Sequence, residues 1–289
     1  MNELKIIDIK AIPEDSAFLL DDGVTSIMVD SGFGFTGYRV ADKIKEYLGE
    51  RPLDYIFLTH SHYDHALGSA YALKYWPDAK VVAGTYAAGI FRREDAIKIM
   101  ERLDRSFAKE NGVDDYEFLG YEMRTDINVD DGDIVEAGTF RFRAIGLPGH
   151  TKCSMGFYEE NHKLLISSET LGHYIGETNI SPLFLVGVQM AFDSIDKVVK
   201  LDPEKILHPH RGLLTQTQRD YFLANVERAN REVVDFIVDF IKAGKSDEEI
   251  IEEFKDRIFG PERENMPPED AVNLNTSIMI KLIKKEYEI

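Results

Sequence analysis

Short apolar runs alternate with polar turn formers over the first part of the chain. The runs are rich in β-branched and aromatic residues, which is typical of strands. Between the third and fourth runs, residues 38–48 carry Val40, Ile44 and Leu48 at helical spacing. The pattern therefore predicts four strands around one helix. We place the strands at residues 4–12, 16–22, 25–32 and 53–60.

The middle of the chain continues with short strands, interrupted by one charged segment. Residues 79–83 form a short apolar run, and residues 86–112 then have a helical and charged pattern. Two later segments, VEAGTFRF and YEENHKLLIS, each read as two strands joined by a tight turn. Strands are predicted at 133–136, 139–145, 155–158 and 163–167.

Beyond residue 215 the pattern becomes helical. Residues 216–243 form one long helical segment, and Ser246 with Glu249 forms a capping box that opens another helix. Residues 261–270 read as a linker before a last helix at 271–287. The order of elements predicts an α/β sandwich followed by a helical C-terminal segment.

Composition and charge narrow the classes of partner. The 289 residues include 34 basic and 52 acidic side chains, for a formal net charge of −18. A surface this acidic repels phosphate backbones and anionic membranes. We therefore expect a small-molecule substrate rather than nucleic acid or a membrane, and the sequence leaves a homo-oligomer open.

Cysteine content and the N-terminal segment bear on location. The chain has one cysteine, so it forms no intrachain disulfide, which fits a reducing compartment. Residues 1–10 lack the long apolar centre of a signal peptide, and no run approaches the roughly 20 apolar residues of a membrane helix. These features predict a cytoplasmic protein.

The strongest chemical motif is HSHYDH, which follows the apolar run at 53–60. Alternate side chains at a strand end share a face, so His60 and His62 can converge on one metal ion. Asp64 and His65 can then point at a second ion nearby. Mixed imidazole and carboxylate ligands suit zinc, iron or manganese better than calcium or magnesium. The motif predicts two divalent transition-metal ions, with zinc as our first choice.

This motif resembles the H-x-H-x-D-H hallmark of the metallo-β-lactamase superfamily, and the resemblance extends over roughly residues 5–215. Asp30 matches an early aspartate, and His150 in the string PGHT matches the third metal-binding histidine. Glu169 stands where most relatives place a bridging aspartate, and His210 matches the final histidine. The resemblance implies a four-layer αββα sandwich and a dinuclear hydrolase.

The resemblance also assigns roles to these residues. It implies that His60, His62 and His150 hold one metal, and that Asp64, His65 and His210 hold the other. Glu169 would bridge the two ions. Asp64 would in addition orient or deprotonate the attacking water, and Asp30 would fix the metal-binding loop by accepting hydrogen bonds.

Domain limits and the helical additions follow from the same resemblance. We expect a catalytic domain at 1–215 and a helical extension at 216–289 that packs on it. A helical insertion at about 86–125 replaces a short connection in a minimal member. Insertion and extension would together cover the active site and select substrate.

Several side chains admit two interpretations. His208 is an alternative to His210 as the ligand. His173 and Tyr174 could contact substrate or lie on the surface, and Arg211 could bind a substrate anion or form a structural ion pair. We interpret Cys153 as a small buried side chain and His162 as a turn residue, both with structural roles.

The expected function is hydrolysis of a small or medium ester, thioester, lactone or phosphoester. A ribonuclease or phosphodiesterase is the first alternative. A flavodiiron-like oxidoreductase is a second, but that group resembles H-x-E-x-D-H, with glutamate at the position of His62. A metal-bound regulator with little turnover is the third.

Overall fold

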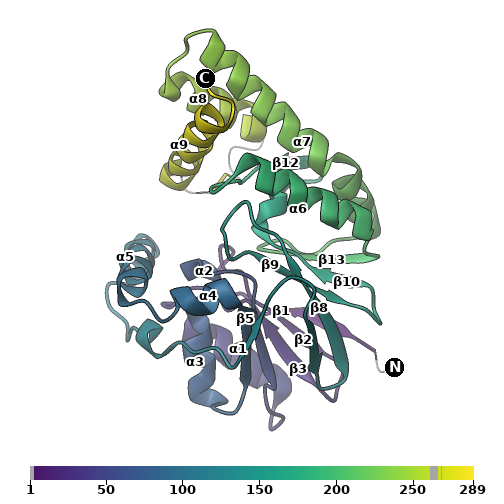
Figure 1. Cartoon of the computed structure of the whole chain (residues 1–289). Helices are drawn as coiled ribbons and strands as arrows, with labels where there is room; N and C mark the ends of the chain where they lie inside the picture. The colour runs from purple at the N-terminus through teal and green to yellow at the C-terminus, as the bar shows by residue number, and fades with distance from the viewer. Residues whose placement is uncertain (1–2, 261–265, 268) are drawn as a thin grey trace. The chain divides into compact units, whose positions relative to one another are not determined.

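Two six-stranded sheets contain the predicted strands and three further ones in the computed structural model, which describes residues 3–260, 266–267 and 269–289. Both sheets belong to a first compact unit made of residues 1–146, 153–168 and 205–213 (Figure 1). The first sheet has the order β1-β2-β3-β4-β5-β6. Its strands are β1 (Lys5–Asp8), β2 (Phe18–Asp21), β3 (Ser26–Val29), β4 (Tyr55–Leu58), β5 (Lys80–Gly84) and β6 (Ile127–Val129).

Parallel pairing in this sheet places the loop that begins with Asp30 and the loop that begins with Thr59 at one edge. β3, β4 and β5 pair in parallel, with Val29 opposite Phe57. The carboxyl ends of these strands therefore meet at the same edge. Asp30 follows β3 directly, and its backbone N–H donates to the carbonyl of Phe57 at 2.8 Å. The segment that begins at Thr59 leaves the sheet beside it.

The second sheet has the order β14-β13-β10-β9-β8-β7. The two predicted tight-turn pairs are confirmed, because β7 pairs antiparallel with β8 and β9 pairs antiparallel with β10. β13 joins β10 in parallel. The strands are β7 (Ile134–Ala137), β8 (Phe140–Gly146), β9 (Met155–Glu159), β10 (Leu164–Ile166), β13 (Lys205–His208) and β14 (Gly212–Leu213).

The two sheets bury a common aromatic core. The ring of Phe57 lies 4.8 Å from that of Phe142 and 4.9 Å from that of Phe157. Alternate residues of the same strands, such as Met28 and Ile56, belong to a second apolar cluster with the helices. A strand that is buried on both faces reads as a continuous apolar run, which is the pattern seen in the sequence.

Helices of the first unit cover the other face of the first sheet. α1 begins at Gly37, close to its predicted start, and buries Val40, Ile44 and Leu48 as the spacing predicts. The predicted helical region after residue 86 is helical as far as Glu110 and then irregular up to a short 3-10 turn, η1. The helices are α1 (Gly37–Leu48), α2 (Tyr63–Ala66), α3 (Gly68–Tyr75), α4 (Thr85–Ile90), α5 (Glu94–Glu110) and η1 (Gly120–Glu122).

A second compact unit comprises residues 147–152, 169–204 and 214–289. The capping box at Ser246 is confirmed, and α7 begins with another at Thr215. Part of the predicted linker, residues 261–265 and 268, lies outside the described residues. The unit contains η2 (Glu169–Leu171), β11 (His173–Ile175), β12 (Asn179–Ser181), α6 (Val188–Leu201), α7 (Gln216–Lys242), α8 (Asp247–Phe259) and α9 (Glu269–Glu286).

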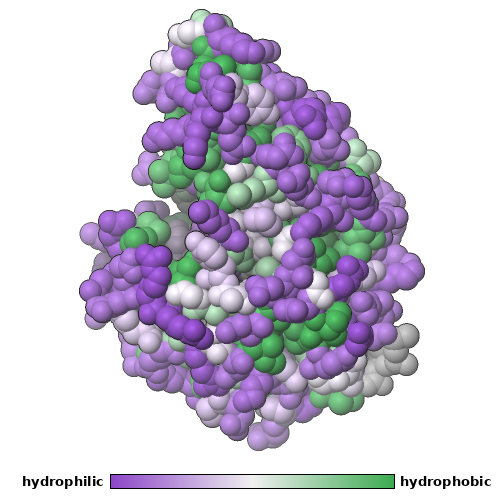
Figure 2. All heavy atoms as spheres, in the orientation of Figure 1, coloured by the Kyte–Doolittle hydropathy of each residue, from purple (hydrophilic) through white to green (hydrophobic). Residues whose placement is uncertain are grey.

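The apolar core of this second unit contains residues from both of its longer segments, 169–204 and 214–289. Val188 and Ala191 of α6 are buried in one cluster with Val233 of α7 and Met279 of α9. None of the described helices is long and apolar enough to span a membrane. The face drawn in Figure 2 is largely hydrophilic, with its apolar residues in scattered groups.

Candidate metal centre

Three imidazoles of the HSHYDH motif lie together at the end of β4. The ring of His60 lies 4.6 Å from that of His62 and 4.1 Å from that of His65. The motif leaves the strand after Leu58 and turns into α2 at Tyr63. The extended backbone before this turn and the helical backbone after it direct the two halves of the motif differently.

Asp64, His65 and His210 form a group that could hold a metal ion within the first unit. One ligand atom from each lies within 4.8 Å of the others. Asp64 Oδ2 lies 3.4 Å from His65 Nε2 and 3.7 Å from His210 Nε2. Two ligands at about 2.1 Å from a tetrahedral ion are about 3.4 Å apart. The three side chains therefore fit one transition-metal ion.

His210, rather than His208, joins this group. His208 is buried at the end of β13, and its Nδ1 lies 2.8 Å from the carbonyl oxygen of Pro209. His210 adopts a left-handed backbone conformation with φ of 58°. Lys10 Nζ donates to its carbonyl at 2.7 Å, which helps to hold this uncommon conformation.

Asp30 organises the motif from the neighbouring strand end. It is 1% exposed and accepts hydrogen bonds from the backbone N–H and the hydroxyl of Thr59 and from Ser16 Oγ. Its Oδ2 lies 2.7 Å from His65 Nδ1. A carboxylate can only accept, so Nδ1 of His65 carries the proton and Nε2 presents its lone pair. The sequence did not point to Thr59 or Ser16 as donors in this network.

His150 is held in the second unit by its own loop. Its backbone N–H donates to Thr170 Oγ1 at 3.1 Å, and its Nδ1 lies 3.0 Å from the carbonyl oxygen of Leu183. Gly149 before it has φ of 145°, and a Cβ there would lie 2.6 Å from Thr170 Cγ2. Because a carbonyl only accepts, Nδ1 of His150 carries a proton, and in the neutral ring this leaves Nε2 as a potential ligand.

Glu169 lies between two imidazoles of the same unit. Its Oε2 is 2.8 Å from His150 Nε2, and its Oε1 is 2.5 Å from His173 Nε2. The lone pair of His150 Nε2 and a carboxylate oxygen repel each other unless a proton or a metal ion lies between them. Two adjacent ligands at about 2.1 Å from an ion, at a right angle, are about 3.0 Å apart. This donor pair therefore suits a transition-metal ion.

The other residues considered as substrate contacts lie in different surroundings. Tyr174 is buried, and its hydroxyl donates to the carbonyl of Glu177 at 2.5 Å. Arg211 is half-buried next to His210, with its backbone N–H donating to the carbonyl of Pro209. A substrate role for either one stays a prediction. Cys153 is buried with Sγ 3.3 Å from Ser61 Oγ, which agrees with the structural interpretation.

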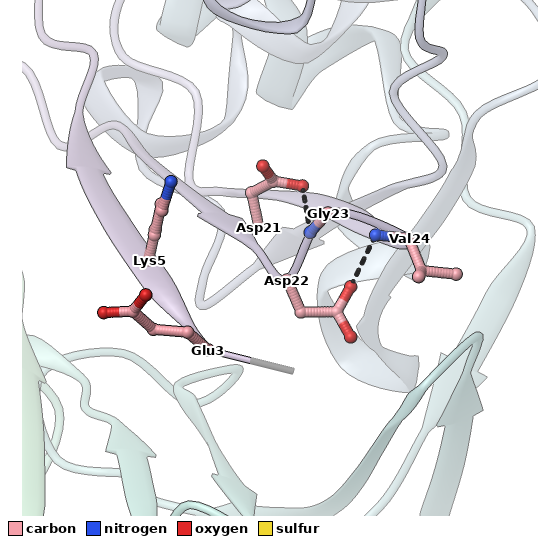
Figure 3. A pocket seen from close by; sticks show the side chains of 6 residues that line it. All are labelled: Glu3, Lys5, Asp21, Asp22, Gly23 and Val24. Carbon is pink, nitrogen blue, oxygen red and sulfur yellow. Dashed lines mark hydrogen bonds between the residues drawn. The ribbon is translucent and has the colours of Figure 1, made fainter. Parts of the chain in front are cut away.

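A pocket elsewhere in the first unit contains no histidine (Figure 3). The turn between β2 and β3 lines this pocket. In that turn, Asp21 and Asp22 accept hydrogen bonds from the backbone N–H groups of Gly23 and Val24. β3 runs from this turn to Asp30, about 13 Å away at 3.3 Å per residue. The pocket thus lies at the opposite end of the strand from the metal motif. Its lining residues are Glu3, Lys5, Asp21, Asp22, Gly23 and Val24.

Comparison with known proteins identifies the family. The model of the metallo-beta-lactamase superfamily matches residues 15–210. A metallo-beta-lactamase fold-containing protein of Sulfurisphaera tokodaii is 27% identical over 195 residues, which cover 66% of this chain and 70% of that protein. A hydroxyacylglutathione hydrolase of Francisella tularensis subsp. novicida is 25% identical over 215 residues, or 73% of this chain and 65% of that hydrolase. This chain thus matches less than two thirds of the hydrolase's length.

Solved structures agree on the fold. A metallo-beta-lactamase family protein from Thermus thermophilus aligns with a TM-score of 0.64 at 17% identity, over 98% of this chain and 93% of that one. A metallo-beta-lactamase superfamily protein from Sulfolobus tokodaii aligns with a TM-score of 0.56 at 22% identity, over 78% and 86%. The predicted α/β fold class is thereby confirmed. The chain belongs to the metallo-β-lactamase superfamily.

Proposed function

We propose that this chain is a metal-dependent hydrolase that acts on a small or medium ester, thioester, lactone or phosphoester through a two-metal centre. The observation that carries the proposal is the Asp64, His65 and His210 group, whose ligand atoms have the spacing that one ion requires. Among relatives, proteins named hydroxyacylglutathione hydrolase support the thioester end of this range.

The ligand assignment that we propose is the one implied by the family motif. His60, His62 and His150 would hold one ion, Asp64, His65 and His210 the other, and Glu169 would bind at the bridging position. We propose zinc in both sites, because imidazole nitrogens dominate the ligand set. When bound, such ions lower the pKa of a water molecule and polarise the scissile carbonyl or phosphoryl oxygen.

The protein's own groups would prepare the site for this chemistry. Asp30 and the carbonyl of Leu183 hold His65 and His150 with Nε2 ready to bind. Asp64 offers a second carboxylate oxygen that can orient the attacking water or take its proton. The substrate is proposed to be a small molecule because the formal charge of −18 disfavours polyanions. The single cysteine, Cys153, supports a cytoplasmic location.

A substrate panel on metal-loaded protein tests the proposal. Aryl esters, acyl thioesters, lactones and aryl phosphoesters would be offered to the wild type, to Asp64→Asn and to His162→Leu. His162 contacts Glu159 in the turn between β9 and β10, so it serves as a control for loss of a histidine. We expect turnover of at least one class, lost in Asp64→Asn by a factor of about 10²–10⁴ and kept in His162→Leu. No turnover of any class by protein that retains its metals would favour a regulator instead.

A further inference from the structure

Glu169 has one methylene more than the aspartate that the family resemblance expects at this position. A longer side chain has an extra torsion that must be fixed before its oxygens can serve a metal. Glu169 is 3% exposed, and an imidazole nitrogen contacts each of its two carboxylate oxygens. The protein therefore fixes this torsion through neighbouring side chains rather than through solvent.

The two imidazoles contact Glu169 in chemically different ways. His150 has its proton on Nδ1, facing the carbonyl of Leu183, so its Nε2 has a lone pair to give. His173 turns Nε2 toward Oε1 of Glu169, which can only accept. In His173 the proton facing Glu169 is therefore on Nε2, and this ring donates a hydrogen bond. Oε1 of Glu169 thus accepts a hydrogen bond from His173, and Oε2 lies beside Nε2 of His150, which can bind a metal ion.

The backbone after Glu169 places His173 independently of any ligand. The N–H of Gly172 donates to the carbonyl of Glu169 at 2.9 Å, which closes a turn. Gly172 has φ of 93°, and a Cβ there would lie 2.7 Å from the carbonyl oxygen of Ser181. His173 then starts β11 and pairs with Ser181 of β12. The ring thus returns beside Glu169 by a fixed turn and a fixed strand register.

From this geometry we infer that His173 is a positioning residue for the metal ligand Glu169. Its Nε2–H holds Oε1, so that Oε2 alone is offered to the ion that His150 binds. Glu169 then serves chiefly one ion instead of bridging two symmetrically. This inference rests on the proposed metal centre, and it gives His173 a role different from the substrate contact considered from the sequence.

Metal affinity of the full-length protein tests the inference without relying on turnover. Zn²⁺ affinity would be measured by chelator competition for His173→Leu, which removes the donor, and for His173→Gln, whose amide keeps an N–H at similar reach. Loss of an outer hydrogen-bond partner typically weakens metal binding about 10–100-fold. We expect that loss in His173→Leu and substantial recovery in His173→Gln. The control His162→Leu breaks a similar His–Glu contact, of 2.8 Å to Glu159, and should bind as the wild type does.

A double-mutant comparison separates positioning from direct ligation. Aspartate at position 169 is too short to reach His173, so His173→Leu should cost little extra affinity in a Glu169→Asp background. Co²⁺-substituted His173→Gln should keep the visible spectrum of the wild type. Loss of a nitrogen ligand from that spectrum would make His173 a ligand and overturn the inference. So would a His173→Leu protein that changes KM but binds metal normally.

The outcome for the wild type distinguishes this inference from the proposed function. A wild-type protein that holds fewer than one ion per chain when metal-replete would overturn the proposed function, and the inference with it. A wild type with both ions and a His173→Leu variant of equal affinity would overturn only the role of His173.

Discussion

Asp30 shows how one carboxylate at a strand end can prepare a ligand that lies far from it in the sequence. It accepts from Thr59, directly after the adjacent strand β4, and from Nδ1 of His65, 35 residues away. The family resemblance implies that Asp30 accepts hydrogen bonds from the metal-binding loop. The donors could not be predicted from the sequence, because they depend on the parallel register of β3 and β4.

Replacing Asp30 with asparagine tests this role. The amide presents one acceptor and one donor, so it cannot serve both Thr59 and His65 as the carboxylate does. We expect metal affinity to fall about 10–100-fold in Asp30→Asn, measured by chelator competition, with little change in far-UV circular dichroism. Asp21→Asn is the control, because Asp21 is also buried but holds Arg51 instead. Equal metal affinity in Asp30→Asn and the wild type would exclude the role.

Asp104 makes the stability of the fold depend on pH. Burial raises the pKa of this carboxyl from 3.8 to about 6, although Tyr116 and the backbone N–H groups of Gly34 and Phe35 donate to it. Between about pH 4 and pH 6 the folded protein keeps a proton that the unfolded chain releases. The free energy of unfolding therefore falls as pH rises through this window.

Urea unfolding at several pH values would measure this contribution. We expect the wild type to lose about 2 kcal/mol relative to Asp104→Asn between pH 4 and pH 6, because the whole shift is worth about 3 kcal/mol at about 1.4 kcal/mol per pKa unit and about two thirds of it falls in this window. Taking the difference between the two proteins removes the pH dependence of other groups. A difference that stays constant across this window would show that Asp104 ionises normally.

Among the elements, those with a strong pattern of their own were predictable. α1, both hairpins of the second sheet and the capping box of α8 agree with the sequence analysis. The sequence analysis assigned no element to α6, although Val188, Ala191, Ile195 and Val198 have helical spacing that could have revealed it. β6, β11 and β12 have three residues each and form by pairing with neighbours, so their own sequences predict little.

The capping box of α8 makes a specific contribution to stability. Ser246 Oγ accepts from the N–H of Glu249 at 3.2 Å, and the side chain of Glu249 accepts from the N–H of Ser246 at 2.9 Å. We expect Ser246→Ala to lower the free energy of unfolding by about 1 kcal/mol, measured by chemical denaturation. Ser246→Asp keeps a capping oxygen and should stay close to the wild type. A similar loss in both variants would point to a cause other than the cap.

The described part of the chain divides into two compact units, whose segments alternate along the sequence. Sequence analysis placed a boundary at residue 215, where the pattern changes from strands to helices. Contacts in the second unit join residues 147–152 and 169–204 to residues 214–289. Such long-range association depends on which apolar faces meet, and local periodicity does not encode it. Whether 1–215 acts as a catalytic domain stays a prediction.

A truncated chain of residues 1–215 would test this organisation. Truncation removes Val233 and Met279, which are buried against Val188 and Ala191 of α6. Exposing that apolar surface should leave the fragment aggregated or sensitive to protease, in contrast to the full chain. Solubility, limited proteolysis and thermal melting would be compared for the two. A stable 1–215 fragment with unchanged metal content would contradict the expectation.

We propose that this member of the metallo-β-lactamase superfamily holds two transition-metal ions through the residues named under the proposed function. Elemental analysis of full-length protein after metal-replete expression and dialysis tests it most directly. We expect close to two ions per chain in the wild type, and close to one in His65→Ala and in His150→Ala, which disrupt different sites. Fewer than one ion per chain in the wild type, or an unchanged content in both variants, would contradict it.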